Sequence, residues 1–155
     1  KRIDAARYFI LNEYGGLYAD MDFECVNNFE YKIPKDRVSI AESPWKNDSR
    51  GETHQNALMI SPPDHPFWNL VFKNLMEARY EPNVLWATGP QIIVKAVRDC
   101  DPRMINTLSS EEFAPTHDDA EFKPYGQEKR TALLSGSINS CVFTRHYGTG
   151  TWLQK

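Results

Sequence analysis

Two aspartates separated by one residue, Asp20 and Asp22, follow a short apolar stretch at residues 17–19. Side chains alternate with period two along extended chain, so both carboxylates are expected to point the same way. Carboxylate oxygens are ligands that hard cations such as Mg²⁺ and Mn²⁺ prefer. In open α/β sheets, ligands bind beyond the carboxyl ends of the strands. The sequence therefore predicts a divalent-cation site here, suited to holding a diphosphate and neutralising its charge as it leaves.

Acid-x-acid triplets are common by chance, and most are solvated loop acids. Whether this one is functional therefore has to be judged from the residues before it. Asp4 and Arg7 are three residues apart on a predicted helix, so they share a face. Taken alone, they are best interpreted as a surface ion pair of little energetic value. Gly15-Gly16 and the short strand then join that helix to Asp20, and this helix-glycine-strand context favours a functional interpretation.

Local patterns predict alternating helices and strands. Residues 3–14 are expected to form a helix, since Ile3, Ala6, Ile10 and Tyr14 recur at helical spacing. The glycine pair at 15–16 is expected to end it by accepting positive φ. The further predictions are strands at 38–41, 57–60 and 138–143, helices at 66–78 and 90–98, and a glycine-punctuated loop at 146–152. The order predicts an α/β sheet.

The composition is that of a globular domain. The chain has 155 residues, of which 41% are hydrophobic and 25% charged, so residues 1–155 are predicted to form a single domain. The net charge of -3 gives no indication of nucleic-acid binding. Cys25, Cys100 and Cys141 are an odd number without a CxxC pair, which argues against a disulfide framework and a zinc knuckle. No apolar run approaches the roughly 20 residues that span a bilayer.

The segment from Asp4 to Asp22 follows the pattern D-x-x-R-Y-x-x-L-x-x-x-G-G-x-Y-x-D-x-D. It resembles the "DXD sugar-binding" segment of glycosyltransferases of the yeast Golgi initiating α-1,6-mannosyltransferase and inositol-phosphoceramide mannosyltransferase type, glycosyltransferase family 32-like. The same local pattern occurs in the glucosylating domains of large clostridial toxins. Two weaker similarities follow, Thr88-Gly89-Pro90 at the start of a later helix and His146 followed by Thr151-Trp152.

The resemblance implies a GT-A (Rossmann-like) α/β fold, a nucleotide-sugar donor, Mn²⁺ (or Mg²⁺) and retention at the anomeric carbon. By the same resemblance, Asp22 binds the metal directly, and Asp20 supports it and contacts the donor. His146 is a third ligand of the metal or the diphosphate, although a single histidine is equally often plain polar surface. The donor-binding residues that the resemblance implies are Asp4, Arg7, Gly15, Gly16, Tyr18, Thr88, Gly89 and Trp152.

These donor-binding roles differ from residue to residue. Asp4 and Arg7 are expected to hold the sugar hydroxyls, and Thr88 and Gly89 to border the active site. Gly15-Gly16 is expected to make a tight turn and leave room for the donor. Trp152 is expected to close over the donor, although a core position is as compatible with the sequence.

One departure from the family pattern concerns the amino terminus. The family has a strand-helix-strand unit before the Asp4 helix, which grips the nucleotide base, and nothing here precedes Lys1. We therefore expect a partial catalytic domain that lacks this nucleotide-binding βαβ unit. The expected donor is GDP-mannose or a UDP-hexose, and the acceptor is a glycan, lipid or protein. The parent protein is expected in the Golgi lumen, with a membrane anchor, if eukaryotic, and in the cytoplasm if bacterial or viral.

Two other functions stay open at this point. In a haloacid-dehalogenase-like phosphatase the first Asp after the strand is the nucleophile; residues 117–119 would supply later acids and Lys95 a phosphate contact. That family usually has Thr or Val two residues after the second Asp, a position that Glu24 occupies here. The second alternative is a non-catalytic nucleotide-sugar-binding remnant. Within the glycosyltransferase interpretation no covalent nucleophile stands out, Glu24 and Glu42 being weak candidates.

Overall fold

A computed structural model describes residues 1–43, 53–114 and 142–146. Within them the chain is mixed α/β, as predicted. The elements run in the order α1 (Arg2–Tyr14), β1 (Gly16–Ala19), β2 (Phe23–Cys25), η1 (Glu30–Lys32), β3 (Val38–Glu42), β4 (His54–Ser61), α2 (Phe67–Glu77), α3 (Val84–Ala87), α4 (Pro90–Asp99), η2 (Pro102–Met104), β5 (Ile105–Leu108), α5 (Ser110–Phe113) and β6 (Thr144–His146).

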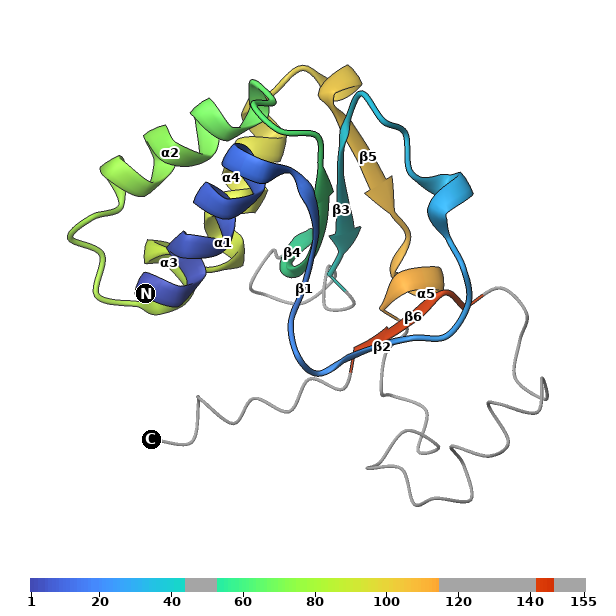
Figure 1. Cartoon of the computed structure of the whole chain (residues 1–155). Helices are drawn as coiled ribbons and strands as arrows, with labels where there is room; N and C mark the ends of the chain where they lie inside the picture. The colour runs from blue at the N-terminus through green and yellow to red at the C-terminus, as the bar shows by residue number, and fades with distance from the viewer. Residues whose placement is uncertain (44–52, 115–141, 147–155) are drawn as a thin grey trace.

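The main sheet has four strands in the order β1-β4-β3-β5. Strand β4 is antiparallel to both β1 and β3, and β3 is parallel to β5. Strands β1, β3 and β5 therefore run in one direction and end at the same edge of the sheet. A second, two-stranded sheet pairs β2 with β6 in antiparallel fashion, and it lies beyond this edge (Figure 1).

Helices α1, α2, α3 and α4 lie together on one side of the sheet (Figure 1), where their apolar side chains form the larger core. Burying each large side chain contributes roughly 2 kcal/mol. The buried members are Tyr8, Leu11, Val38, Ile40, Met59, Phe67, Trp68, Val71, Ile92, Ile93, Ala96 and Ile105. A smaller cluster joins β3, β4, β5 and α5, namely Ala41, Leu58, Leu108, Phe113 and Phe143.

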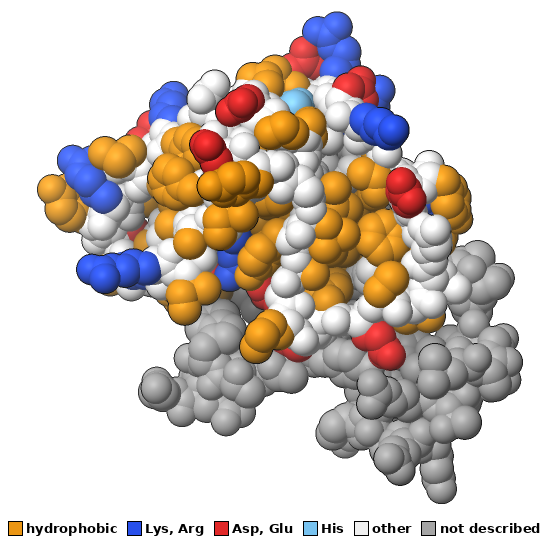
Figure 2. All heavy atoms as spheres, in the orientation of Figure 1, with side chains coloured by type: hydrophobic (Ala, Val, Ile, Leu, Met, Phe, Trp, Pro, Cys, Tyr) orange, Lys and Arg blue, Asp and Glu red, His pale blue; other side chains and the backbone are white. Residues whose placement is uncertain are grey.

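The face that α1 buries differs from the prediction. The helix itself is confirmed, but Ile3 is 80% and Tyr14 77% exposed, whereas Arg7, Tyr8 and Leu11 are buried. Counting only apolar residues selected the wrong face, because the polar groups of Arg7 and Tyr8 find hydrogen-bond partners inside the protein. Figure 2 shows that hydrophobic side chains are exposed over much of the viewed face. No helix in the described part of the chain is both long and apolar enough to cross a bilayer.

The other predictions of elements vary in outcome. The strands at 38–41 and 57–60 and the helices at 66–78 and 90–98 are confirmed as β3, β4, α2 and α4. Strand β5 was not predicted, because this stretch of the sequence is polar and rich in turn-forming residues. The last strand was predicted at 138–143 and is found at Thr144–His146, where it pairs with β2. Residues 138–141 lie outside the described part.

The glycine pair ends α1 as predicted. Both glycines have positive φ, 63° for Gly15 and 89° for Gly16, and the ψ of Gly15 is -154°, a combination that only glycine adopts readily. A Cβ atom on Gly15 would lie 2.7 Å from Pro63 N and 2.8 Å from Ser61 O. The space at Gly15 is therefore taken by the protein's own backbone, at the end of β1 opposite to Asp20.

These two glycines form a matched pair for a stability experiment. Gly16→Ala is expected to cost about 1 to 2 kcal/mol, since nothing lies within 4 Å of a Cβ there and only backbone strain opposes it. Gly15→Ala is expected to cost at least about 3 kcal/mol, because the backbone of Pro63 and Ser61 must also move. Urea unfolding of the two variants measures this difference. Equal losses would contradict the packing argument.

Candidate metal and donor-binding site

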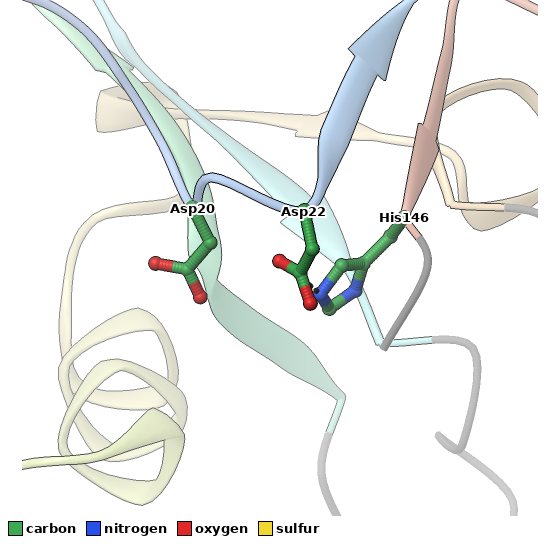
Figure 3. Close-up of side chains that lie close together, drawn as sticks. All are labelled: Asp20, Asp22 and His146. Atoms are coloured by element: carbon green, nitrogen blue, oxygen red, sulfur yellow. Dashed lines mark ion pairs between the residues drawn. The ribbon is translucent and has the colours of Figure 1, made fainter. Parts of the chain in front are cut away.

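Asp20 and Asp22 lie in a turn between β1 and β2, and not in extended chain as predicted. The Phe23 N–H donates to the Asp20 carbonyl over 3.0 Å, and the Asp20 N–H donates to the Ala57 carbonyl over 2.8 Å. Met21 between them is fully exposed. The two carboxylates do point to the same side, as predicted (Figure 3). The cause is the turn, and not the side-chain alternation of an extended strand.

His146 joins the two aspartates from the far end of the described chain. Strand β6 pairs with β2 in a register that sets His146 opposite Phe23, and the two rings stack with centroids 4.4 Å apart. This holds His146 Nε2 3.4 Å from Asp22 Oδ1. One ligand atom from each of Asp20, Asp22 and His146 lies within 4.8 Å of the other two, as Figure 3 shows.

These three side chains suit a divalent cation. An ion bound at about 2.1 Å keeps its ligand atoms no more than about 4.2 Å apart, so a small closure of the cluster brings all three into reach. Two carboxylates and one imidazole are ligand types that Mn²⁺ accepts, and carboxylates also suit Mg²⁺. The geometry therefore agrees with the predicted ligand set, while the metal itself stays a prediction.

Arg7 links this cluster to Asp4. Its Nη1 donates to Asp20 Oδ1 over 2.9 Å and to the Asn56 carbonyl over 3.0 Å, and its Nη2 donates to Asp4 Oδ1 over 2.7 Å. The Arg7 side chain is 7% exposed. The interpretation of Asp4 and Arg7 as a surface ion pair is therefore wrong. Arg7 Nε is buried without a hydrogen-bond acceptor among the described residues, and the guanidinium carbon lies 4.6 Å from the centre of the Tyr18 ring.

Tyr18 orients the Asp20 carboxylate from the other side. Its hydroxyl donates to Asp20 Oδ1 over 2.6 Å. Burial, and then this hydrogen bond, raises the pKa of Tyr18, so the hydroxyl keeps its proton at neutral pH and stays a donor. Asp20 Oδ1 thus receives bonds from Arg7 and Tyr18.

The Thr88-Gly89 turn between α3 and α4 reaches the same cluster. Thr88 Oγ1 donates to Asp4 Oδ2 over 3.3 Å. A Cβ on Gly89 would lie 2.7 Å from the Cα of Leu85, so glycine permits the close turn at this point. The structure brings Asp4, Arg7, Tyr18 and Thr88 together around Asp20, and their contacts with a donor stay predictions.

Other predicted residues lie elsewhere. Gly15 and Gly16 are at the amino end of β1, away from the aspartates, and Trp152 is outside the described residues, as are residues 117–119. Lys95 forms an ion pair with Glu77 of α2. Glu42 accepts a hydrogen bond from the Ser110 N–H, an ordinary structural contact.

Two buried residues around the site, Tyr8 and Asn56, were missed by sequence reasoning. Tyr8 is completely buried and Asn56 is 8% exposed, and Asn56 Nδ2 donates to the Tyr8 hydroxyl over 2.9 Å. An amide directly before the apolar run at 57–60 was the available signal, because a buried amide needs a partner.

The amino-terminal part of the chain is similar to a known protein family. Residues 1–42 match the family described as "Glycosyltransferase sugar-binding region containing DXD motif". The match covers 42 of the 155 residues of the chain. The stretch includes α1, β1 and the turn with Asp20 and Asp22, and so it contains the predicted signature in full.

The proteins to which the chain is similar include named glycosyltransferases. A mannosyl phosphorylinositol ceramide synthase of Saccharomyces cerevisiae is 34% identical over 100 residues, 60% of this chain and 24% of that protein. Inositol phosphoceramide mannosyltransferase 1 of Schizosaccharomyces pombe is 30% identical over 58% of this chain and 28% of its own length. An uncharacterized glycosyltransferase of Acanthamoeba polyphaga mimivirus is 27% identical over 64% of this chain and 39% of its own. The chain therefore spans less than half the length of these relatives.

The fold has a counterpart among solved structures. The PaToxG glycosyltransferase superposes with a TM-score of 0.52 at 23% sequence identity, over 64% of this chain and 34% of that chain. This likeness confirms the predicted GT-A fold for the part of the chain that it covers.

Proposed function

We propose that this chain is the catalytic domain, in part or whole, of a metal-dependent retaining glycosyltransferase, which moves a hexose from a nucleotide-sugar donor to an acceptor hydroxyl. The observation that carries the proposal is the convergence of Asp20, Asp22 and His146 at the sheet edge where β1 ends. Directly beside them, Arg7 ties Asp20 to Asp4. The site thus offers a cation-binding half and a polar half.

The cation-binding half suits the diphosphate of the donor. Asp22 and His146 lie 3.4 Å apart and Asp20 is oriented by Arg7 and Tyr18, so the ligands are arranged before anything binds. A divalent cation there supplies positive charge that stabilises the leaving diphosphate. Prearranged ligands matter because they need little rearrangement during the reaction.

The polar half suits the sugar. Asp4 is partly exposed, at 24% of its side chain, and Thr88 lies next to it. A carboxylate accepts and a threonine hydroxyl both donates and accepts hydrogen bonds, which are the contacts that sugar hydroxyls need. The positive charge of Arg7, which forms ion pairs with both Asp4 and Asp20, offsets the repulsion between these two carboxylates.

The names of the relatives support a particular donor sugar and acceptor. One is named as a synthase of mannosyl phosphorylinositol ceramide. Another is named as a mannosyltransferase of inositol phosphoceramide. We therefore favour GDP-mannose over a UDP-hexose of the galactose or glucose type as donor. We also favour a phosphoinositol-containing lipid as acceptor, over a glycan or a protein.

Calorimetric titration tests the donor site. GDP, UDP, GDP-mannose and UDP-glucose are titrated into the protein with Mn²⁺ and again with EDTA. We expect guanine nucleotides to bind in Mn²⁺ and binding to weaken at least about tenfold in EDTA, because the diphosphate is held through the cation. Binding that EDTA does not change would contradict the metal site. Failure of every nucleotide to bind the folded protein would contradict the proposed function of this chain.

A further inference from the structure

The Tyr8 hydroxyl lies where three elements of the fold meet. Its single proton is shared between the Thr88 carbonyl, at 2.9 Å, and the Gly89 carbonyl, at 3.3 Å, in the turn between α3 and α4. It also accepts a hydrogen bond from Asn56 Nδ2 of β4 over 2.9 Å. Tyr8 itself belongs to α1, so one buried hydroxyl connects α1, β4 and the α3–α4 turn.

Asn56 extends these connections to the charged groups of the site. Its side chain binds Tyr8, and its own carbonyl accepts from Arg7 Nη1 over 3.0 Å. The next carbonyl of β4, that of Ala57, accepts from the Asp20 N–H over 2.8 Å. The start of β4 therefore holds Arg7, Asp20 and Tyr8 in fixed positions relative to one another.

Tyr8 and Asp4, both on α1, form hydrogen bonds with the Thr88-Gly89 turn. Its hydrogen bond to Asp4, from Thr88 Oγ1 over 3.3 Å, is long. The contact of the Tyr8 hydroxyl with the Thr88 carbonyl is shorter, at 2.9 Å, and partly buried. Its contact with the Gly89 carbonyl is buried. The turn is also held by backbone bonds from the Thr88 and Gly89 N–H groups to the Val84 carbonyl, over 3.1 and 2.9 Å. Those bonds fix it to α3 and do not reach α1, so the Tyr8 hydroxyl is the buried link that sets its distance from Asp4.

We propose that Tyr8 and Asn56 are positioning residues, which hold the Thr88-Gly89 turn against Asp4 and Arg7 and so determine how tightly the sugar part of the donor is bound. This inference rests on the proposed function. It assigns the pair to the polar half of the site only. In the cation-binding half, His146 is held by the β2–β6 pairing, and Asp20 is held by Arg7, Tyr18 and the Ala57 carbonyl. None of these contacts uses the Tyr8 hydroxyl or the Asn56 side chain. The cation-binding half should therefore be insensitive to the pair.

Tyr8→Phe tests this assignment. The phenyl ring preserves the packing against Trp68, whose ring centre is 6.1 Å away, and only the hydroxyl is lost. Asn56 Nδ2 and the turn carbonyls then lose a buried partner. We expect affinity for GDP-mannose in Mn²⁺ to fall roughly tenfold, and affinity for GDP to change less than about twofold, by calorimetry. The ratio of the two dissociation constants is the readout, since a general loss of structure would weaken both.

Two further variants complete the experiment. Asn56→Ala keeps the Tyr8 hydroxyl on the turn carbonyls and should raise the ratio of the GDP-mannose to the GDP dissociation constant less than Tyr8→Phe does. Combined with Tyr8→Phe it should add less than its separate effect, since both act on one network. It also keeps the test decisive if Tyr8→Phe does not fold. Ser61→Ala is the matched control. It removes a buried bond, Trp68 Nε1 to Ser61 Oγ at 2.9 Å, from the far end of β4, and should leave the ratio unchanged.

The possible outcomes distinguish a failure of the positioning role from a failure of the proposed function. A selective loss of GDP-mannose affinity in Tyr8→Phe and Asn56→Ala, absent in Ser61→Ala, supports it. Equal weakening of GDP and GDP-mannose, or an unchanged ratio, overturns the positioning role while leaving the donor site intact. If the unaltered protein binds uracil rather than guanine nucleotides, the same ratio is measured with UDP-glucose and UDP. Failure of the unaltered, folded protein to bind either GDP or UDP in Mn²⁺ overturns the proposed function, and with it any role of the pair in sugar binding.

Discussion

Asp22→Asn is expected to abolish Mn²⁺-dependent nucleotide binding and to lower glycosyl transfer by at least about a thousandfold. The amide preserves the shape of the side chain but removes the negative charge that a cation requires. Asp22 has His146 as a neighbour at 3.4 Å, so a cation would be left with one carboxylate and one imidazole. The effect on folding is expected to be small, because Asp22 lies in a turn outside both hydrophobic clusters.

Calorimetry with GDP and Mn²⁺, together with a transfer assay, measures this effect. Asp36→Asn is the charge-matched control, since its side chain is 81% exposed and its ion pair with Arg37 is long, at 3.9 Å. It changes the net charge equally and should behave like the unaltered protein. Mn²⁺-dependent binding that survives in Asp22→Asn would remove the DXD turn from the metal site.

Arg7→Met is expected to have the second largest effect, and to act on stability as well as on activity. It leaves the Asp4 and Asp20 carboxylates close together without the guanidinium that forms ion pairs with both. Removing one partner of a buried ion pair costs about 3 to 5 kcal/mol, and we expect the low end because both acids are partly exposed. Transfer should be lost with it, since Asp20 loses one of the two donors that orient it.

Arg7→Lys is not expected to restore function. The two η nitrogens of Arg7 point to different acids, and a single ammonium cannot reproduce this fork. Urea unfolding measures the stability of both variants, and Arg2→Met is the control, because Arg2 is an exposed residue on the same helix. If Arg7→Met were as stable as Arg2→Met, the network around Asp20 would not be structurally important.

Much of the site was predictable because its signals are local. Asp4, Arg7, the glycine pair and the two aspartates lie within a short segment, and each has a chemical reason for its residue type. Helix spacing placed Asp4 and Arg7 on one face, and the structure joins them directly. Positive φ at Gly15 and Gly16 followed from the position of glycines after a helix.

The errors arose where distant residues decide the outcome. Arg7 is buried because β4 and the turn supply partners for it, and no periodicity within α1 contains that information. The turn at Asp20–Asp22 is closed by a bond from Phe23, whereas alternation assumes an extended chain. Strand β5 has the mixed burial of a strand at the edge of the sheet, and so it lacks a clear apolar pattern.

The pairing of β2 with β6 has a consequence for how the site opens. His146 reaches the aspartates through a separate two-stranded ribbon, whereas Asp20 is attached to the main sheet through Ala57. Small paired segments open at a lower free energy than core strands. The ribbon can thus fray while the main sheet stays folded, and amide hydrogen exchange would be faster in β2 than in β4. A ligand bound by all three side chains would slow that exchange by mass action, so occupancy of the site and order of the ribbon are thermodynamically linked.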